Sequence, residues 1–312
     1  MLPIVYHEGY EVDIGGHVFP TAKYRLVLDR LLLEGVIRRE DLQRAPPARD
    51  QDIRLVHSAA WVEKLKTGDL SRQERITLEV PYSEALRDAA WLCSGGSILT
   101  ARLALEGGVA VHIGGGFHHA FPGHGEGFCP LNDTAVAIQR LRASHEIERA
   151  MVVDCDVHHG NGTAAVFARD PEVFTFSMHQ ENNYPLFKPA GDLDLGLDDG
   201  VSDAEYLALL EGHLPGCLES HAPQFAFYLA GADPYCEDQL GGLGLTLEGL
   251  RRRDDFVLRT LAAAGVPAGV LLAGGYACNT LDTVSIHCGS VMAARSALEE
   301  VWVLDQGVPQ AE

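Results

Sequence analysis

Several features are missing from this chain of 312 residues. It has no apolar run long enough to span a bilayer, and Met1 to Tyr6 is typical of a first strand, not of a signal peptide. Its seven cysteines are scattered and include no Cys-x-x-Cys pair, which favours small packed thiols in a reducing compartment. We therefore expect a cytoplasmic protein with no membrane partner.

Basic residues are also scarce. Lysine and arginine number 24 against 44 aspartates and glutamates, a net charge of −20, and they cluster only at residues 251–253. A nucleic-acid partner is therefore not expected, and we interpret the arginine triplet as a solvated helix face. An acidic surface favours cationic substrates such as lysine-bearing peptides or amines. The hydrophobic fraction of 46% is enough for a large core, and nothing in the sequence indicates the oligomeric state.

An apolar segment, a glycine-rich or polar loop and a helix follow one another repeatedly along the chain. We expect strands at residues 2–6, 53–56, 109–113, 150–153, 173–178, 225–230 and 270–273. We expect helices at residues 21–34, 83–106, 133–143, 202–220, 246–264 and 283–300, with short helices and loops at 58–80. This alternation predicts an α/β fold with a mostly parallel sheet of about eight strands and helices on both faces. No linker or composition shift divides the chain, so we predict a single domain over residues 1–312.

The stretch Asp154-Cys-Asp156-Val-His158 follows the apolar segment 150–153. If the strand continues, Asp154, Asp156 and His158 share one face. Two carboxylates and an imidazole at a buried strand end repel one another and are poorly solvated unless a divalent cation binds. Taken alone, Asp-x-Asp is usually a turn or a helix start, and a histidine pair is usually surface or satisfied core. Three such residues at period two, before two nearby glycines, favour a zinc or iron(II) site.

Asp233 follows the apolar segment 225–230 and is a candidate third ligand. The carboxyl ends of parallel strands meet at one edge of a sheet, so Asp156, His158 and Asp233 are expected to lie together. Three protein ligands with an open position are the pattern of a catalytic metal site. Alone, Asp233 would equally well be a helix cap or a turn residue.

Two further loops at the same predicted edge carry reactive groups. His118 and His119 follow a triple glycine, and such a pair could activate water and later donate a proton. Tyr276 follows a glycine pair and could aim its hydroxyl at a developing oxyanion. Each signal is modest alone, since an adjacent histidine pair is usually a surface loop and a tyrosine after a strand usually packs.

Five motifs occur together: Gly114-Gly-Gly-Phe-His-His-Ala120, Gly127-Phe-Cys129 with Asn132-Asp133, Asp-x-Asp-x-His-His-Gly at 154–160, Gly231-Ala-Asp233 and Gly274-Gly-Tyr276. In this order they resemble the metal-dependent histone deacetylase family. The runs Leu2-Pro-Ile-Val-Tyr6 and Leu240-Gly-Gly-Leu243 are most similar to its class IV branch. The resemblance implies the arginase/deacetylase fold and hydrolysis of the amide of acyl-lysine, with an acetyl or longer acyl chain, in a protein or peptide.

The resemblance also implies a role for each residue of the site. It implies that Asp156, His158 and Asp233 are the zinc ligands. It implies that His119 is the general base and then acid, oriented by Asn161, and that His118, held by Asp154, is an electrostatic helper. Tyr276 would stabilise the oxyanion. For a structural K⁺ it implies Asp154, the hydroxyl of Ser177 and the backbone of Asp156, His158 and Met178. For substrate binding it implies Gly127, Phe128, Tyr184, Leu240 and Gly275. Asn161 carries no charge, so we expect His119 to be a weaker base than one held by Asp.

Three alternatives stay open. The substrate could be a small acylated amine, although Leu240 stands where polyamine deacetylases carry an acidic residue, which argues against a polyamine. The chain could be a ureohydrolase-like enzyme with two metal ions, or a non-catalytic module that binds acyl-lysine. The residues leave the native metal open between zinc and iron(II).

Overall fold

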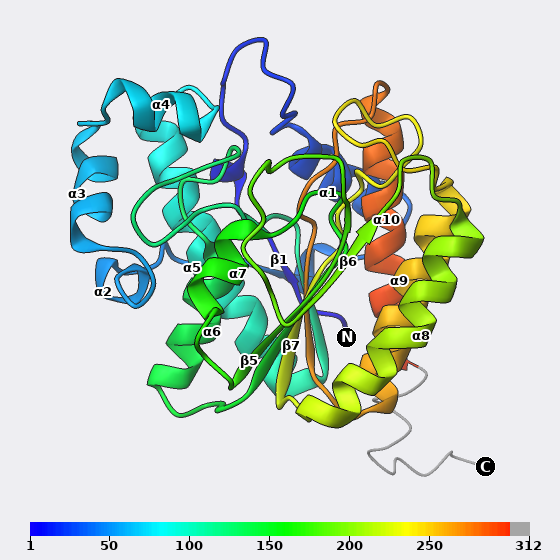
Figure 1. Ribbon diagram of the computed structural model, residues 1–312. Helices are drawn as coiled ribbons and strands as arrows, with labels where there is room; N and C mark the ends of the chain where they lie inside the picture. The colour runs from blue at the N-terminus through cyan, green and yellow to red at the C-terminus, as the bar shows by residue number, and fades with distance from the viewer. Residues whose placement is uncertain (300–312) are drawn as a thin grey trace.

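A computed structural model describes residues 1–299 of the protein and shows one eight-stranded sheet between two layers of helices (Figure 1). All neighbouring strands are parallel. The order across the sheet is β2-β1-β3-β8-β7-β4-β5-β6. The strands are β1 (Ile4–Val5), β2 (Leu42–Gln43), β3 (Val109–His112), β4 (Ala150–Asp154), β5 (Val173–Gln180), β6 (Leu193–Leu197), β7 (Phe225–Leu229) and β8 (Ala268–Leu271). The predicted α/β fold with its parallel sheet is confirmed.

The central strands are apolar on both faces because helices cover both sides. In β4, Met151 and Val153 enter the core on one face and Val152 enters the core on the other. In β7, Tyr228 packs into the core on the first face and Phe227 into the core on the second. Alternate residues of a strand point to opposite faces, so a strand buried on both sides reads as a continuous hydrophobic run.

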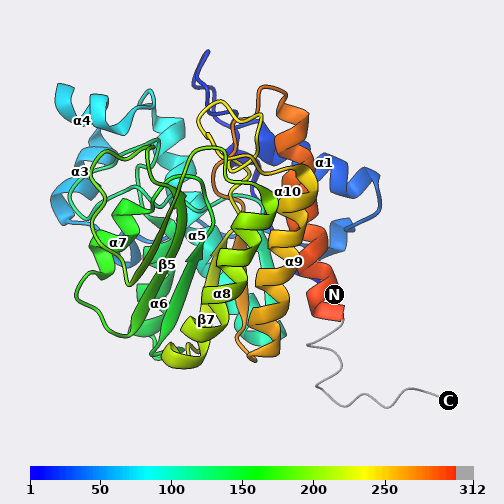
Figure 2. The ribbon, with the colours of Figure 1, turned by 45° about the vertical axis from the view of Figure 1, so that its right-hand side comes forward.

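The helices form two layers. On one face α1 (Lys23–Leu33), α8 (Asp203–His221), α9 (Leu247–Ala263) and α10 (Thr280–Ala297) pack side by side (Figure 2). On the other face lie α5 (Glu84–Gly107), α6 (Asp133–Ala143) and α7 (Asn161–Phe167), with α2 (Asp50–Ile53), α3 (Ala59–Thr67) and α4 (Arg72–Leu78) beside α5 (Figure 1). Side-chain oxygens cap the N-termini of several helices. Ser83 accepts a hydrogen bond from the N–H of Leu86 at the start of α5, and Asn132 accepts one from the N–H of Ala135 at the start of α6.

The structure corrects three details. The strand expected at residues 53–56 is wrong, because α2 occupies 50–53, where Arg49 pairs with Asp52 across one turn. The loop expected up to residue 200 contains β6, whose Leu-Asp-Leu-Gly-Leu alternation fits a half-buried edge strand. The two-residue β2 was not expected either. The last helix is described to Ala297, and its predicted end at Glu300 lies outside the described residues.

A buried arginine joins two strand ends beneath the functional edge. Arg253 of α9 is fully buried, and its Nη1 donates to the carbonyls of Cys155 and Gly231 at 3.1 and 2.7 Å. Its charge is balanced by Asp254, whose Oδ1 lies 2.8 Å from Nη2. Arg253 therefore fixes the ends of β4 and β7 relative to each other.

Arg253→Met should destabilise the fold strongly, because it leaves the buried carboxylate of Asp254 without its cation. We expect a loss of about 3–5 kcal/mol in the free energy of unfolding, measured by urea denaturation. Arg251→Met on the same helix is the control, since Arg251 is exposed and its pairs with Glu248 and Asp255 lie at the surface. Equal losses for both variants would contradict the role given to Arg253.

Candidate active site and metal centre

Three predicted ligands meet at the carboxyl edge of the sheet. Asp156 and His158 follow β4, and Asp233 follows its neighbour β7. One ligand atom from each lies within 4.8 Å of the others, and all three residues are buried. Nδ1 of His158 is 3.1 Å from Oδ1 of Asp156 and 3.5 Å from Oδ2 of Asp233. The structure thus brings the predicted trio together.

Backbone groups orient the carboxylates. The N–H of Val157 donates to Oδ1 of Asp233, and that of Gly274 donates to Oδ2 of Asp156, both at 2.8 Å. Oδ2 of Asp233 is buried with no hydrogen-bond partner among the described residues. A Cβ on Gly274 would lie 2.0 Å from this oxygen, so only glycine fits here.

A divalent cation would suit this trio. Burial and the charge of Asp156 raise the pKa of Asp233 to about 7, because two carboxylates share one dry site. An unpaired buried oxygen beside an imidazole nitrogen and a second carboxylate is a donor set that zinc or iron(II) accepts. We therefore find that the residues fit the expected metal.

The histidine pair lies against this trio. Nδ1 of His118 donates to Oδ2 of Asp154 at 2.7 Å, and Nε2 of His118 is 3.1 Å from Nε2 of His119. Burial disfavours the charged ring, but the charges of Asp154 and Asp156 outweigh it and raise the pKa of His118 to about 9. Nδ1 of His118 thus has a carboxylate partner, and its Nε2 faces Nε2 of the neighbouring histidine.

His119 is kept neutral. Burial and the neighbouring rings of His118 and His158 hold its pKa well below the usual value. Its Nδ1 donates to Oδ1 of Asn161 at 2.7 Å, which leaves Nε2 as the basic nitrogen. This arrangement suits a group that takes a proton from water.

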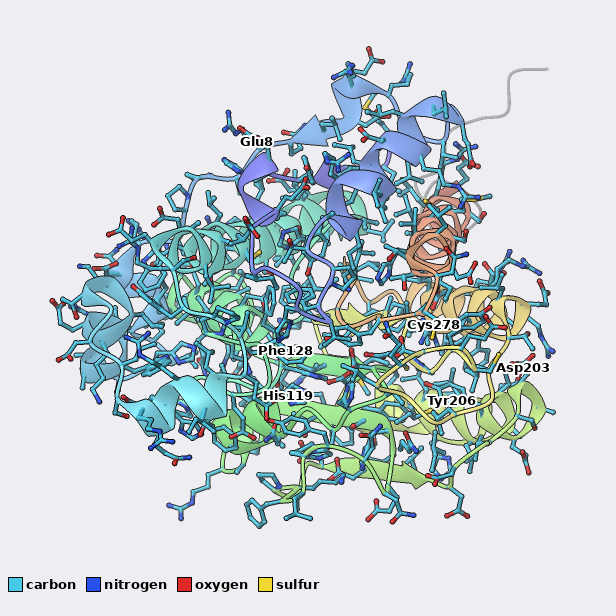
Figure 3. The ribbon with its side chains drawn as sticks, turned by 90° about the horizontal axis from the view of Figure 1, so that it is seen from above. Glu8, His119, Phe128, Asp203, Tyr206 and Cys278 are labelled. Atoms are coloured by element: carbon cyan, nitrogen blue, oxygen red, sulfur yellow. The ribbon has the colours of Figure 1, made fainter. Side chains whose placement is uncertain are left out.

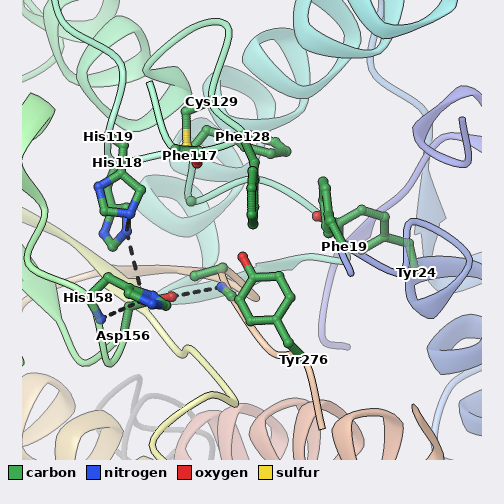
Figure 4. A pocket seen from close by; sticks show the side chains of 15 residues that line it. Phe19, Tyr24, Phe117, His118, His119, Phe128, Cys129, Asp156, His158 and Tyr276 are labelled. Carbon is green, nitrogen blue, oxygen red and sulfur yellow. Dashed lines mark hydrogen bonds and ion pairs between the residues drawn. The ribbon is translucent and has the colours of Figure 1, made fainter. Parts of the chain in front are cut away.

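Tyr276 faces the same space from the loop after β8 (Figure 4). Burial and the charges of Asp156 and Asp233 raise its pKa well above 10, so the hydroxyl stays protonated and can donate. Its backbone N–H donates to Oδ2 of Asp238 at 2.6 Å. The buried ammonium of Lys23 lies 5.6 Å from its ring centre. Both contacts hold the tyrosine in place.

An outer groove of about 160 Å³ leads to these groups. It is lined by Glu79, His119, Gly127, Phe128, His158, Asn183, Tyr184, Leu240 and Tyr276. His119 and Phe128, which both line the groove, are labelled near the centre of Figure 3. Gly127 has a φ of 51°, and a Cβ there would lie 2.7 Å from the ring of His119 and 2.9 Å from that of Tyr184. A much smaller chamber of about 20 Å³ adjoins the groove, and Phe128 and Tyr276 line both.

The other predicted residues fall as follows. Gly275 lines neither the groove nor the chamber, and a Cβ there would meet Ala232 and Thr283, whereas Gly274 lines the chamber. A role of Gly275 in substrate binding stays a prediction. Asp154 and Ser177 are register partners on β4 and β5, as a shared cation site requires. The K⁺ itself, with Met178 as a further ligand, stays a prediction.

A second set of ligand-type residues lies near the sheet edge: His159, His179 and Asp194. Nε2 of His159 is 3.1 Å from Oδ1 of Asp194, and Nδ1 of His179 is 2.9 Å from Oγ of Ser177. Nδ1 of His159 is buried with no hydrogen-bond partner among the described residues.

Sequence reasoning missed three residues of the site: Lys23, Glu126 and Asp238. Lys23 donates to the carbonyl of Ala273 at 2.8 Å, and burial lowers its pKa to about 8 despite nearby carboxylates. Glu126 accepts from Asn161, and Asp238 accepts from the backbone of Tyr276. Lys23 sits on an amphipathic helix among apolar residues, a weak signal. The other two lie in loops without any pattern.

Comparison with known proteins now decides the family. The pattern described as the histone deacetylase domain matches residues 17–292. The chain belongs to the histone deacetylase family. Histone deacetylase 2 of Arabidopsis thaliana is 30% identical over 288 residues, which cover 88% of this chain and 74% of that protein. Membership in the family implies a hydrolase with deacetylase or deacylase activity.

Other relatives agree. A protein of Picosynechococcus sp., named only as uncharacterised, is 43% identical over 294 residues that cover 94% of this chain and 98% of that protein. Histone deacetylase 1 of Homo sapiens is 28% identical, and the match spans 60% of its length. The crystal structure of the HDA15 HD domain shares the fold, with a TM-score of 0.80 at 24% identity over 97% of this chain and 94% of that chain. Similarity to the class IV branch stays a prediction.

Within residues 1–299 no helix is both long and apolar enough to cross a membrane.

Asp233→Asn should remove the bound divalent metal, because the buried amide can offer only a neutral oxygen to the cation. We expect about one metal ion per chain in the wild-type protein and far less in the variant, measured by mass spectrometry of dialysed protein. Asp194→Asn, in the second set, should leave the count unchanged. Full metal content in Asp233→Asn would exclude this residue as a ligand.

Proposed function

We propose that this protein is a metal-dependent deacylase that hydrolyses the amide of acyl-lysine in proteins or peptides. One observation carries the proposal: an imidazole, a tyrosine ring and two members of the three-ligand cluster face one small pocket. His119 and Tyr276 line that pocket together with Asp156 and His158. An amidase needs a base, an oxyanion donor and a Lewis acid at one point, and these groups supply all three roles.

The chain's own residues would act in sequence. His119 accepts a proton from the attacking water at Nε2 while its Nδ1–H continues to donate to Oδ1 of Asn161. Tyr276 donates its hydroxyl proton in a hydrogen bond to the oxygen of the acyl group as negative charge develops there. His119 then returns the proton to the leaving lysine nitrogen, and His118 stabilises the arrangement from its bond to Asp154.

Zinc or iron(II), held by Asp156, His158 and Asp233, would polarise the acyl carbonyl and lower the pKa of water. The fit of the trio, with its unpaired Oδ2 on Asp233, supports this assignment.

The groove supports a linear acylated amine as the substrate. Phe128 and Tyr184 stand on its walls, and such aromatic sides suit the aliphatic part of a lysine side chain. Leu240 at the same groove is apolar, which argues against a polyamine. The protein's net charge of −20 favours a cationic peptide around the modified lysine.

The ureohydrolase alternative is less favoured. A two-metal centre holds its ions about 3.5–4 Å apart and therefore needs additional ligands beside the first set. Among residues 1–299, the only other three-ligand set is His159, His179 and Asp194, which shares no member with the trio. In this pocket the group beside the trio is a tyrosine hydroxyl, a donor for an oxyanion.

Tyr276→Phe should lower kcat by about 10²-fold or more with the metal retained, because one oxyanion donor is lost. The measurement is the rate of free lysine amine release from an acetyl-lysine peptide, with the metal content checked in the same preparation. Tyr206→Phe is the control, since Tyr206 is a buried tyrosine of α8 that does not line the pocket. An unchanged rate in Tyr276→Phe would remove this residue from the mechanism.

Acetyl-lysine should be turned over faster than myristoyl-lysine. The chamber that the catalytic groups line holds only about 20 Å³, close to the room for one water molecule, and a long acyl chain would need it to expand. A panel of peptides from acetyl to myristoyl, with acetylated polyamines alongside, measures kcat/KM with and without a chelator. A preference for myristoyl would show that the chamber opens on binding.

A further inference from the structure

Glu126 contacts Asn161, the residue that orients His119. Glu126 lies in the loop before α6, and its side chain is 18% exposed. Its Oε1 accepts from Nδ2 of Asn161 at 2.7 Å and from the hydroxyl of Tyr184 at 3.1 Å. The loop itself is fixed, because Glu126 and Cys129 exchange backbone hydrogen bonds at 3.1 and 2.9 Å. The carboxylate of Glu126 is thus held between Asn161, which orients His119, and Tyr184 on the wall of the groove.

The amide of Asn161 has two different ends, and only one of them serves His119. With Oδ1 toward His119, the ring carries its proton on Nδ1, and its Nε2, which lies 3.1 Å from Nε2 of His118, is the nitrogen that can take a proton. With the amide reversed, its NH₂ would face Nδ1, and a neutral ring would then carry its proton on Nε2. Such a ring cannot accept a proton from water.

Glu126 decides between the two orientations. A carboxylate only accepts hydrogen bonds, so it favours the orientation in which the NH₂ of Asn161 points toward it. Reversal would set the amide oxygen against Oε1, two acceptors at the present separation of 2.7 Å. An aspartate at position 161 would not need this control, because both of its oxygens accept.

We propose that Glu126 is a positioning residue that fixes the tautomer of His119 through the amide of Asn161. This inference rests on the proposed function, in which Nε2 of His119 is the base. The bond from Tyr184 to the same oxygen connects the groove wall to this chain of contacts. Glu126 acts only through Asn161 and Tyr184 and does not itself line the groove.

The tautomer can be measured without any turnover. Nitrogen-15 NMR of histidine-labelled protein, zinc-loaded and metal-free, distinguishes a ring protonated on Nδ1 from one protonated on Nε2, and the signals of His119 are assigned by their loss in His119→Gln. We expect the Nδ1–H form in the wild type and a shift toward the Nε2–H form in Glu126→Leu. An unchanged Nδ1–H form in Glu126→Leu overturns the proposal.

Kinetics give a second, independent test. Glu126→Leu should lower kcat by about 10- to 100-fold with KM changed by less than about threefold, since general base catalysis is lost and binding is not. Glu126→Gln can still accept from Asn161 and should lose less. Adding Asn161→Asp to Glu126→Leu should restore most of the rate, because no amide remains to be oriented. Failure of this rescue in a folded protein overturns the proposal.

His124→Gln is the matched control. It removes the other partner of Glu126, the Nε2 of His124 at 3.2 Å from Oε2, at a side chain that is 39% exposed. We expect its kcat to match that of the wild type, and a loss equal to that of Glu126→Leu would count against the role of Asn161. If the wild type were inactive on every acyl amide tested, the proposed function would fail, while the NMR result would still decide the role of Glu126.

Discussion

Three carboxylates buried together at one sheet edge are the constraint on which the rest of the structure depends. Asp154, Asp156 and Asp233 are almost inaccessible to water, and like charges in a dry site repel strongly. Backbone N–H groups donate to these carboxylates, the imidazole of His118 contacts Asp154, and the trio of Asp156, His158 and Asp233 suits a divalent ion. Removing any one of these partners leaves a buried charge uncompensated.

This constraint also explains why the pocket is built from small residues and aromatic rings. Gly274 must lack a side chain because the carboxylate of Asp233 occupies that space. Gly127 lets the backbone pass between the rings of His119 and Tyr184. The rings of Phe128 and Tyr276 then exclude water, so every charge–dipole interaction inside is stronger than it would be in bulk solvent. Reactivity and stability are therefore adjusted by the same few contacts.

Much of the fold and of the site could be predicted. Long apolar runs such as β4 and β7 can be recognised in the sequence because both of their faces are buried. Asp156, His158 and Asp233 follow these runs within a few residues. Some short or edge elements were not predicted: residues 53–56 lie outside the sheet, and β6 is only five residues long within a long loop. Local pattern decides such segments poorly because tertiary packing outweighs their propensity.

The sequence alone determined the parallel α/β sheet, the ligand trio and the order of the catalytic loops, because periodicity and motif spacing are local properties of the chain. Only the tertiary structure decided which distant side chains support them. Glu126 meets Asn161 from 35 residues away and Tyr184 from 58. Lys23 meets Ala273 from 250 residues away. No spacing rule relates such positions, since their contact exists only after the layers have packed.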